Sequence, residues 1–126
     1  MTRRCNASIP SPVRAEISTA PGTVAQEIAI GGLRLRHEPL AGDQLGEIAG
    51  HLHPGAVVVR RGRAVRRRCF ASDGARLIMP AFGAFTGALN VLDRAYDGLF
   101  CRESLVAHML GEARVYAVPG HRLRRG

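Results

Sequence analysis

The sequence predicts an α/β (α+β) domain built mostly of β-strands in a mixed or antiparallel sheet, with one or two short helices. Several segments alternate apolar and polar residues, which is the pattern of a half-buried strand. Short Gly-containing turns join many of them, which is typical of antiparallel neighbours. Hydrophobic residues make up 46% of the 126 residues and there is no Trp, so the core must rest on Val, Ile, Leu and Ala.

The expected strands are short and follow one another closely. Residues 31–32 are Gly-Gly and join the first two strands in a hairpin, whose second strand alternates leucines with arginines and ends at His37. This alternation places His37 on the same face as two leucines. Turns at residues 61–63 and 72–74 then connect a three-stranded meander. The expected strands cover residues 24–30, 33–37, 47–49, 56–60, 64–70, 76–79 and 113–118.

The remaining segments complete the expected organisation. Residues 80–90 are rich in Gly and Phe without a clear period, which predicts an ordered loop. Short helices are expected within residues 91–100 and 104–110. We expect three regions: a loosely structured, Pro-punctuated segment over 1–22, one domain over 23–120, and a basic tail over 121–126.

Arginine dominates the charge of the chain. All 18 basic residues are Arg, the formal net charge is +8 and the sequence pI is about 11.1. A strongly basic chain suits an anionic partner such as DNA, although surplus charge also serves solubility. An arginine cluster around the second turn is therefore either a solvated hairpin surface or a sequence-independent phosphate contact. The candidate phosphate-binding residues are Arg60, Arg61, Arg63, Arg66 and Arg68.

Histidines are concentrated in one stretch of the chain. The sequence holds five, and three of them, His37, His51 and His53, lie within 17 residues. A Gly-His-x-His unit directly after an apolar strand favours metal binding over local hydrogen bonding, because neutral imidazole is the commonest metal ligand in proteins. Alternate residues of an extended chain point to opposite sides, so His51 and His53 could approach two metals from different directions.

The cysteines and the N-terminus bear on location. Three cysteines without CxxC spacing match neither a disulfide framework nor a zinc finger, and they fit a reducing cytoplasm. The first residues lack the apolar region of a secretory signal. No apolar run is long enough to span a membrane.

These motifs together resemble one bacterial branch of the calcineurin-like metallophosphoesterases. The resemblance covers residues 24–118 and is carried by His37-Glu38-Pro39, by Gly-His-Leu-His-Pro at 50–54, by Arg-Arg-Arg-Cys-Phe at 66–70 and by the Pro-Ala-Phe-Gly-Ala-Phe-Thr-Gly stretch at 80–87. The branch is the ligase-associated DNA damage response phosphoesterase, an endonuclease that occurs beside a DNA ligase and a DEAD/DEAH-type helicase.

The resemblance implies a fold, metals and partners. It implies an α/β/β/α sandwich with two metals between the sheets, often manganese, with zinc or iron as alternatives. By the pattern of the family, His37 and His51 would bind one metal and His53 the other. It also implies DNA as substrate and proteins associated with the DNA ligase or helicase as partners.

The chain departs from the family pattern in one large respect. The Asp-x-His, Gly-Asp and Gly-Asn-His-Asp motifs that precede the equivalent of His37 are missing. The chain thus resembles the C-terminal half of the domain, which points to a truncated gene, a mis-set start or a degraded copy. We expect an incomplete metal site with little activity, and homo-oligomers or partial disorder, because half of a sandwich leaves one sheet face uncovered. The alternative is a non-catalytic basic nucleic-acid-binding module, so enzyme status stays open.

Overall fold

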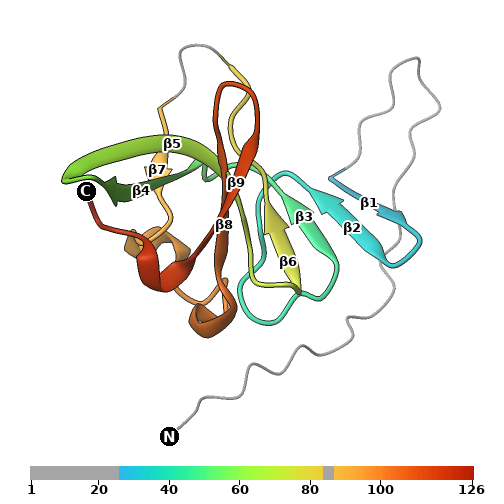
Figure 1. Ribbon diagram of the computed structural model, residues 1–126. Helices are drawn as coiled ribbons and strands as arrows, with labels where there is room; N and C mark the ends of the chain where they lie inside the picture. Colours follow the sequence, from blue (N-terminus) through green and yellow to red (C-terminus); the bar gives the residue numbers. More distant parts are fainter. Residues whose placement is uncertain (1–25, 84–86) are drawn as a thin grey trace, which may run out of the picture.

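The computed structural model describes residues 26–83 and 87–126. This part of the chain contains nine strands and three 3₁₀ helices (Figure 1). The strands are β1 (Glu27–Ile30), β2 (Leu33–Arg36), β3 (Glu47–Ala49), β4 (Pro54–Arg60), β5 (Arg63–Ser72), β6 (Arg76–Ile78), β7 (Leu89–Asn90), β8 (Val106–Leu110) and β9 (Val115–Pro119). The 3₁₀ helices are η1 (Arg94–Tyr96), η2 (Arg102–Ser104) and η3 (Gly120–Arg122).

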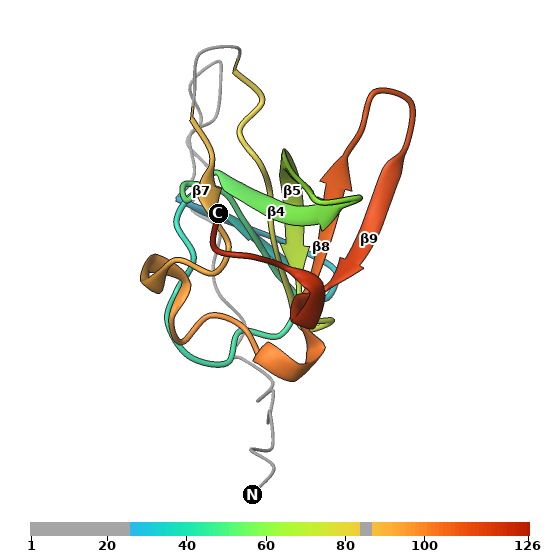
Figure 2. The ribbon, with the colours of Figure 1, turned by 60° about the vertical axis from the view of Figure 1, so that its left-hand side comes forward.

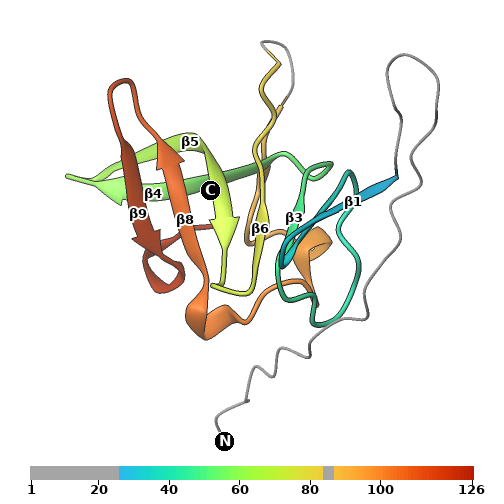
Figure 3. The ribbon, with the colours of Figure 1, turned by 90° about the vertical axis from the view of Figure 1, so that its right-hand side faces the viewer.

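The strands form one mixed sheet, as the sequence predicts. The order is β1-β2-β3-β6-β5-β4-β7, and β8 and β9 branch from β5. Strand β5 makes the branch possible because it is 10 residues long: its first part pairs with β4, and its last part pairs with β6 and β8. Strand β4 therefore crosses the direction of β8 and β9 (Figure 3). The β2-β3 and β3-β6 pairs are parallel, whereas β5 pairs antiparallel with β4, β6 and β8.

The core lies between the sheet and the three helical turns, which lie below β4 in the view of Figure 2. Small side chains from the strands meet large ones from the turns and their flanks, so close packing is reached with few aromatic residues. The core residues are Ala56, Cys69, Ala71, Val91, Tyr96, Leu105, Ala107, Met109 and Leu123. Cys69 is a buried free thiol whose pKa burial raises to about 12. Cys101 is disulfide-bonded.

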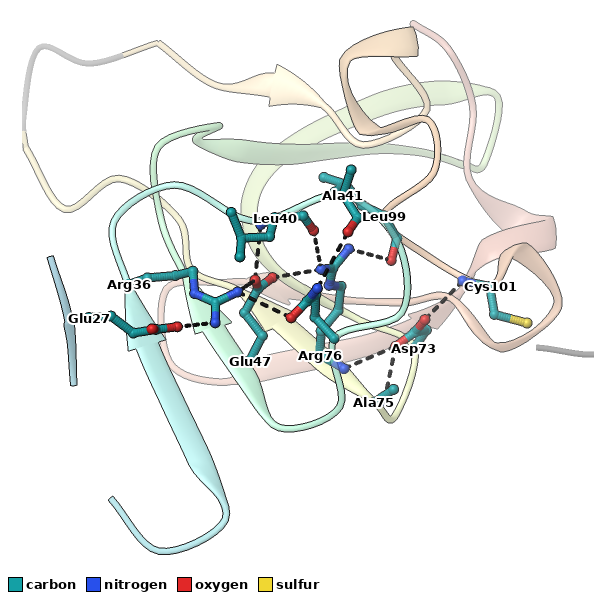
Figure 4. A network of polar contacts seen from close by, with 11 residues as sticks. Glu27, Arg36, Leu40, Ala41, Glu47, Asp73, Ala75, Arg76, Leu99 and Cys101 are labelled. Carbon is teal, nitrogen blue, oxygen red and sulfur yellow. Dashed lines mark hydrogen bonds and ion pairs between the residues drawn. The ribbon is translucent and has the colours of Figure 1, made fainter. Parts of the chain in front are cut away.

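A buried network of charges replaces the expected leucine core beneath β2 (Figure 4). Arg36 and Arg76 both contact the carboxylate of Glu47, at 2.6 and 3.0 Å. Arg36 also pairs with Glu27 across the β1-β2 hairpin. Burial lowers the pKa of Arg76, and the charge of Glu47 opposes that effect. The side chains of Arg36, Glu47 and Arg76 are at most 5% exposed.

The face of β2 expected to be buried is only partly buried, because Leu35 is half-buried and Leu33 is exposed. Ile28, Ile30 and Leu33 are 43%, 58% and 44% exposed, while Arg36 points inward. The prediction that the side chains of β2 alternate between two faces is correct. The prediction that the leucine face points inward is not, because ion pairing allows an arginine to lie in the interior. The described residues thus leave an apolar sheet face at the β1-β2 edge.

The helix expected at residues 104–110 is wrong, because Val106–Leu110 is strand β8. Its burial alternates with a period of two: Ala107 and Met109 are buried, and Val106, His108 and Leu110 are half-buried. Strands β5 and β9 pair with its two sides. Within residues 91–100 the expected helix is the single turn η1, which the carboxylate of Asp93 caps through the amide of Ala95.

The expected loop and terminal regions also gain detail. The loop predicted over residues 80–90 ends in the short strand β7. In the expected tail, Leu123 is 4% exposed and Arg124 forms a bridge to Val57. The segment 1–22 and the first residues of the strand expected at 24–30 lie outside the described residues.

Gly46 joins the β1-β2 hairpin to the start of β3, and an Ala there should be strongly destabilising. Its φ is +82°, and a Cβ would clash with the carbonyl oxygen of Gly32. We expect Gly46→Ala to lower the free energy of unfolding by about 3 kcal/mol, from left-handed strain plus the backbone clash. Gly74 has a φ of +91° with nothing near the Cβ position, so Gly74→Ala should cost only about 1 kcal/mol. If urea denaturation shows that Gly46→Ala and Gly74→Ala lower the free energy of unfolding equally, the proposed backbone clash at Gly46 is wrong.

Candidate metal centre

His37 and His51 are brought together by the parallel pairing of β2 with β3. Arg36 and Ala49 are register partners at the carboxyl ends of these strands. The next residues along each strand are therefore neighbours, and the amide of Gly50 donates to the carbonyl of His37 at 2.9 Å. His51 follows at once. Neighbouring parallel strands end at the same edge of a sheet, so both imidazoles lie at that edge.

The two rings face each other with one nitrogen each. His51 Nδ1 lies 3.2 Å from His37 Nε2, and the rings are nearly perpendicular, at 74°. For metal–nitrogen bonds of about 2.0–2.1 Å, this separation corresponds to an angle of roughly 100° at the metal, near the tetrahedral value. The same separation also suits a hydrogen bond between one protonated and one unprotonated nitrogen. The geometry therefore fits a shared metal, with a His–His hydrogen bond as the alternative.

The backbone at the two motif histidines is strained. His51 has a φ of 75° and His53 a φ of 52°. The left-handed region costs a non-Gly residue roughly 1–2 kcal/mol. Among the described residues the only other non-Gly residue with positive φ is Arg61, in the β4-β5 turn. Gly50, which directly precedes the unit, is not among the positive-φ glycines. Strain kept at such residues is common where a loop carries function.

Tyr96 contacts the backbone of the loop that carries His51 and His53. Its hydroxyl lies 3.1 Å from the carbonyl oxygen of Leu52 and 3.0 Å from that of Leu89. The amide of Leu89 in turn donates to the carbonyl of His53 at 2.8 Å. Burial raises the pKa of Tyr96, so the hydroxyl stays protonated and remains a donor. The Tyr96 hydroxyl thus lies between the carbonyl of Leu52, the middle residue of the His-x-His unit, and the carbonyl of Leu89 in β7.

Removing the Tyr96 hydroxyl should loosen the loop without emptying the core. We expect Tyr96→Phe to weaken zinc binding about 10-fold and to lower the free energy of unfolding by about 1–2 kcal/mol, since it removes the one O–H that donates to the carbonyl of Leu52 or of Leu89. Tyr116→Phe is the matched control, because Tyr116 is 46% exposed. Zinc titration and urea denaturation measure the two effects. Unchanged zinc affinity with lowered stability would show that Tyr96 does not position the histidines.

The other candidate ligands lie apart from this pair. No contact joins His53 to either ring, and the carboxylate of Glu38 lies beside the pair, with Oε1 at 4.0 Å from His51 Nε2. Within residues 26–83 and 87–126 no group of three or more His, Cys, Asp or Glu side chains could hold one metal. The described residues thus offer two nitrogen ligands. Because His51 and His53 are both left-handed, the extended-chain argument for their opposite directions does not apply.

The candidate phosphate-binding arginines lie on the β4-β5 hairpin. Four of them are exposed: Arg60, Arg61, Arg63 and Arg66. Arg68 differs, because it is half-buried and donates to the carbonyl of Ala81 at 3.0 Å. Arg67, which was not among the candidates, is exposed. The hairpin therefore presents several guanidinium groups to solvent.

No protein-family model and no curated protein matches the chain. The chain is similar to the crystal structure of the Pseudomonas putida nuclease MPE, with 29% sequence identity and a TM-score of 0.49. The match covers 72% of this chain and 40% of the nuclease, so the chain spans less than half of that protein's length. No helix in the described part of the chain is long and apolar enough to cross a membrane.

Proposed function

We propose that the chain carries half of the metal centre of a phosphoesterase that cleaves phosphodiester bonds in nucleic acid. The observation that supports this most is the pair of imidazole nitrogens 3.2 Å apart, at the end of two parallel strands. The left-handed backbone of His51, beside the pair, supports it independently, since the fold maintains a costly conformation there. Manganese is the proposed metal, with zinc or iron as alternatives.

The residues of the chain have separate roles in this proposal. His37 Nε2 and His51 Nδ1 would hold one metal, and His53 is the ligand available to a second. A bound metal would polarise a phosphoryl oxygen and make bound water a better nucleophile at neutral pH. Glu38 would orient the His51 ring from its Nε2 side. The arginines of the β4-β5 hairpin would bind the phosphate backbone on either side of the cleaved bond.

Two imidazoles cannot by themselves hold two metal ions close together. Neighbouring dications repel each other, and anionic bridging ligands must offset that repulsion. We therefore expect the chain to show no manganese-dependent cleavage of bis-p-nitrophenyl phosphate above the buffer rate. Robust cleavage that His51→Ala abolishes would show instead that a complete centre forms. By the family resemblance, proteins associated with a DNA ligase or helicase are the partners we propose.

A non-catalytic nucleic-acid-binding module is the second candidate function. The exposed arginines of the β4-β5 hairpin favour it, because phosphate binding by guanidinium groups needs no metal. Manganese or zinc titration separates the two candidates. DNA binding that is complete in a chelator, by a chain that binds no metal, would support the module and contradict the metal centre.

A further inference from the structure

The last residues of the chain are a fixed part of the sheet. Leu123 is 4% exposed and belongs to the core. The amide of Arg124 donates to the carbonyl of Val57 at 2.8 Å, and Asn90 Nδ2 donates to the carbonyl of Arg124 at 2.9 Å. In Figure 2 this segment runs beside β4. The segment thus continues the line of β7 along β4.

This placement puts two arginines on either side of one β4 residue. Val57 is the register partner of Arg66 on β5 and the bridge partner of Arg124. Residues paired across neighbouring strands point to the same face, so both arginines flank Val57 on one face, with backbones two strand spacings apart, about 10 Å. Val57 is only 2% exposed. Arg66 Nη2 also lies 3.3 Å from the Cβ position of Gly126, so the end of the chain lies against Arg66.

In the described part of the chain, no Asp or Glu side chain forms an ion pair with Arg66 or Arg124. The ion pairs found among the described residues involve Glu27, Glu38, Glu47 and Asp97. Arg124 Nη1 donates to the carbonyl of Leu123 at 3.1 Å, which restrains its guanidinium at the surface. Arg122 and Arg125 are exposed on the same segment. A restrained guanidinium loses less entropy when it binds an anion.

We propose that Arg66 and Arg124 form a row that binds the phosphate backbone of a nucleic-acid strand. The C-terminal segment thereby extends the basic surface of the β4-β5 hairpin. The proposal rests on nucleic acid being the substrate of the proposed function. Phosphate is the anion that repeats at regular spacing and accepts forked guanidinium bonds. No aromatic side chain stands in the row Arg66–Val57–Arg124, so base stacking is not expected and binding should be independent of sequence.

Salt-dependent DNA binding by the full chain tests the row. We expect Arg124→Gln to weaken binding of a labelled duplex of arbitrary sequence about 5- to 10-fold at low salt, and to reduce the slope of log K against log salt by about 1. Arg66→Gln should act alike, and the double variant should reduce the slope by about 2. Arg124→Lys should keep most of the slope, because it keeps the charge. Fluorescence anisotropy in EDTA measures these values free of metal effects.

Arg34→Gln is the charge-matched control, since β2 lies at the far end of the sheet from β4 (Figure 1). If Arg124→Gln binds DNA like Arg34→Gln, the row is overturned. Tighter binding of poly-glutamate than of DNA at equal charge would overturn the nucleic-acid assignment in favour of an acidic protein. Zinc titration of the same variants distinguishes the metal centre from the arginine row. Zinc binding tests the metal centre alone, and Arg124→Gln should leave it unchanged.

Discussion

Replacing Glu47 with Ala is expected to lower the free energy of unfolding by about 3–5 kcal/mol, because it leaves two buried guanidinium groups without their shared carboxylate. Arg36 and Arg76 contact different oxygens of Glu47. One of those oxygens also accepts the amide of Leu40 at 3.0 Å. Glu47 therefore joins β2, β6 and the loop after β2, which includes the segment that carries His37. Urea denaturation measures the loss.

Asp97→Ala is the matched control for Glu47→Ala. It breaks the ion pair between Asp97 and Arg102, whose side chains are 64% and 53% exposed. An exposed pair of this kind contributes no more than about 1 kcal/mol. A Glu47→Ala loss as small as the Asp97→Ala loss would show that water or rearranged side chains compensate the buried arginines. A large loss would identify the network as the element that holds β2 against β3.

His51→Ala and His37→Ala are each expected to weaken zinc binding about 100-fold, or ~2.7 kcal/mol, since each removes one of two nitrogens that face each other. His53→Ala should have a smaller effect on the first ion, because His53 does not contact the pair. Isothermal titration with zinc measures all three. The prediction fails if His53→Ala lowers the affinity for the first zinc ion as much as His51→Ala does.

His51→Gly separates ligand loss from misfolding. Glycine adopts a φ of 75° without strain, so this variant should keep the stability of the chain to within about 1 kcal/mol while losing the zinc. A variant that is folded and does not bind zinc assigns the effect to the imidazole. A variant that still binds zinc removes His51 from the site.

Much of the fold could be predicted from the sequence, because strand alternation and Gly-containing turns are local signals. The hairpins of β1-β2 and β4-β5 lie at the predicted turns. Strand β8 was not predicted because Val106–Leu110 is apolar except for His108, a pattern that suits a short helix equally well. The inward face of β2 was also misread, because the choice depends on Glu47 and Arg76, which are distant in sequence and reveal their pairing only in the fold.

The residues of the candidate site differ in how far the sequence could predict their arrangement. Local patterns identified His37 and His51 as candidates, and the parallel register of β2 and β3 brings them together. The left-handed backbone of His51 and His53 could not be foreseen, because a residue with a Cβ rarely adopts it and the neighbouring Gly50, which could adopt it without strain, does not. The pairing of Arg124 with β4 could not be predicted either. A basic segment at the end of a chain is expected to be an exposed tail unless the structure shows that one of its residues, here Leu123, is buried.

The number of metal ions bound per chain tests the central claim most directly. Half of a binuclear centre, with one facing pair of imidazoles and no third ligand among the described residues, predicts one zinc ion per chain, bound weakly and lost in His51→Gly. Isothermal titration of the full chain, with the bound zinc counted by atomic emission after gel filtration, gives this number. No bound zinc, or two zinc ions that His51→Gly leaves in place, would contradict the account.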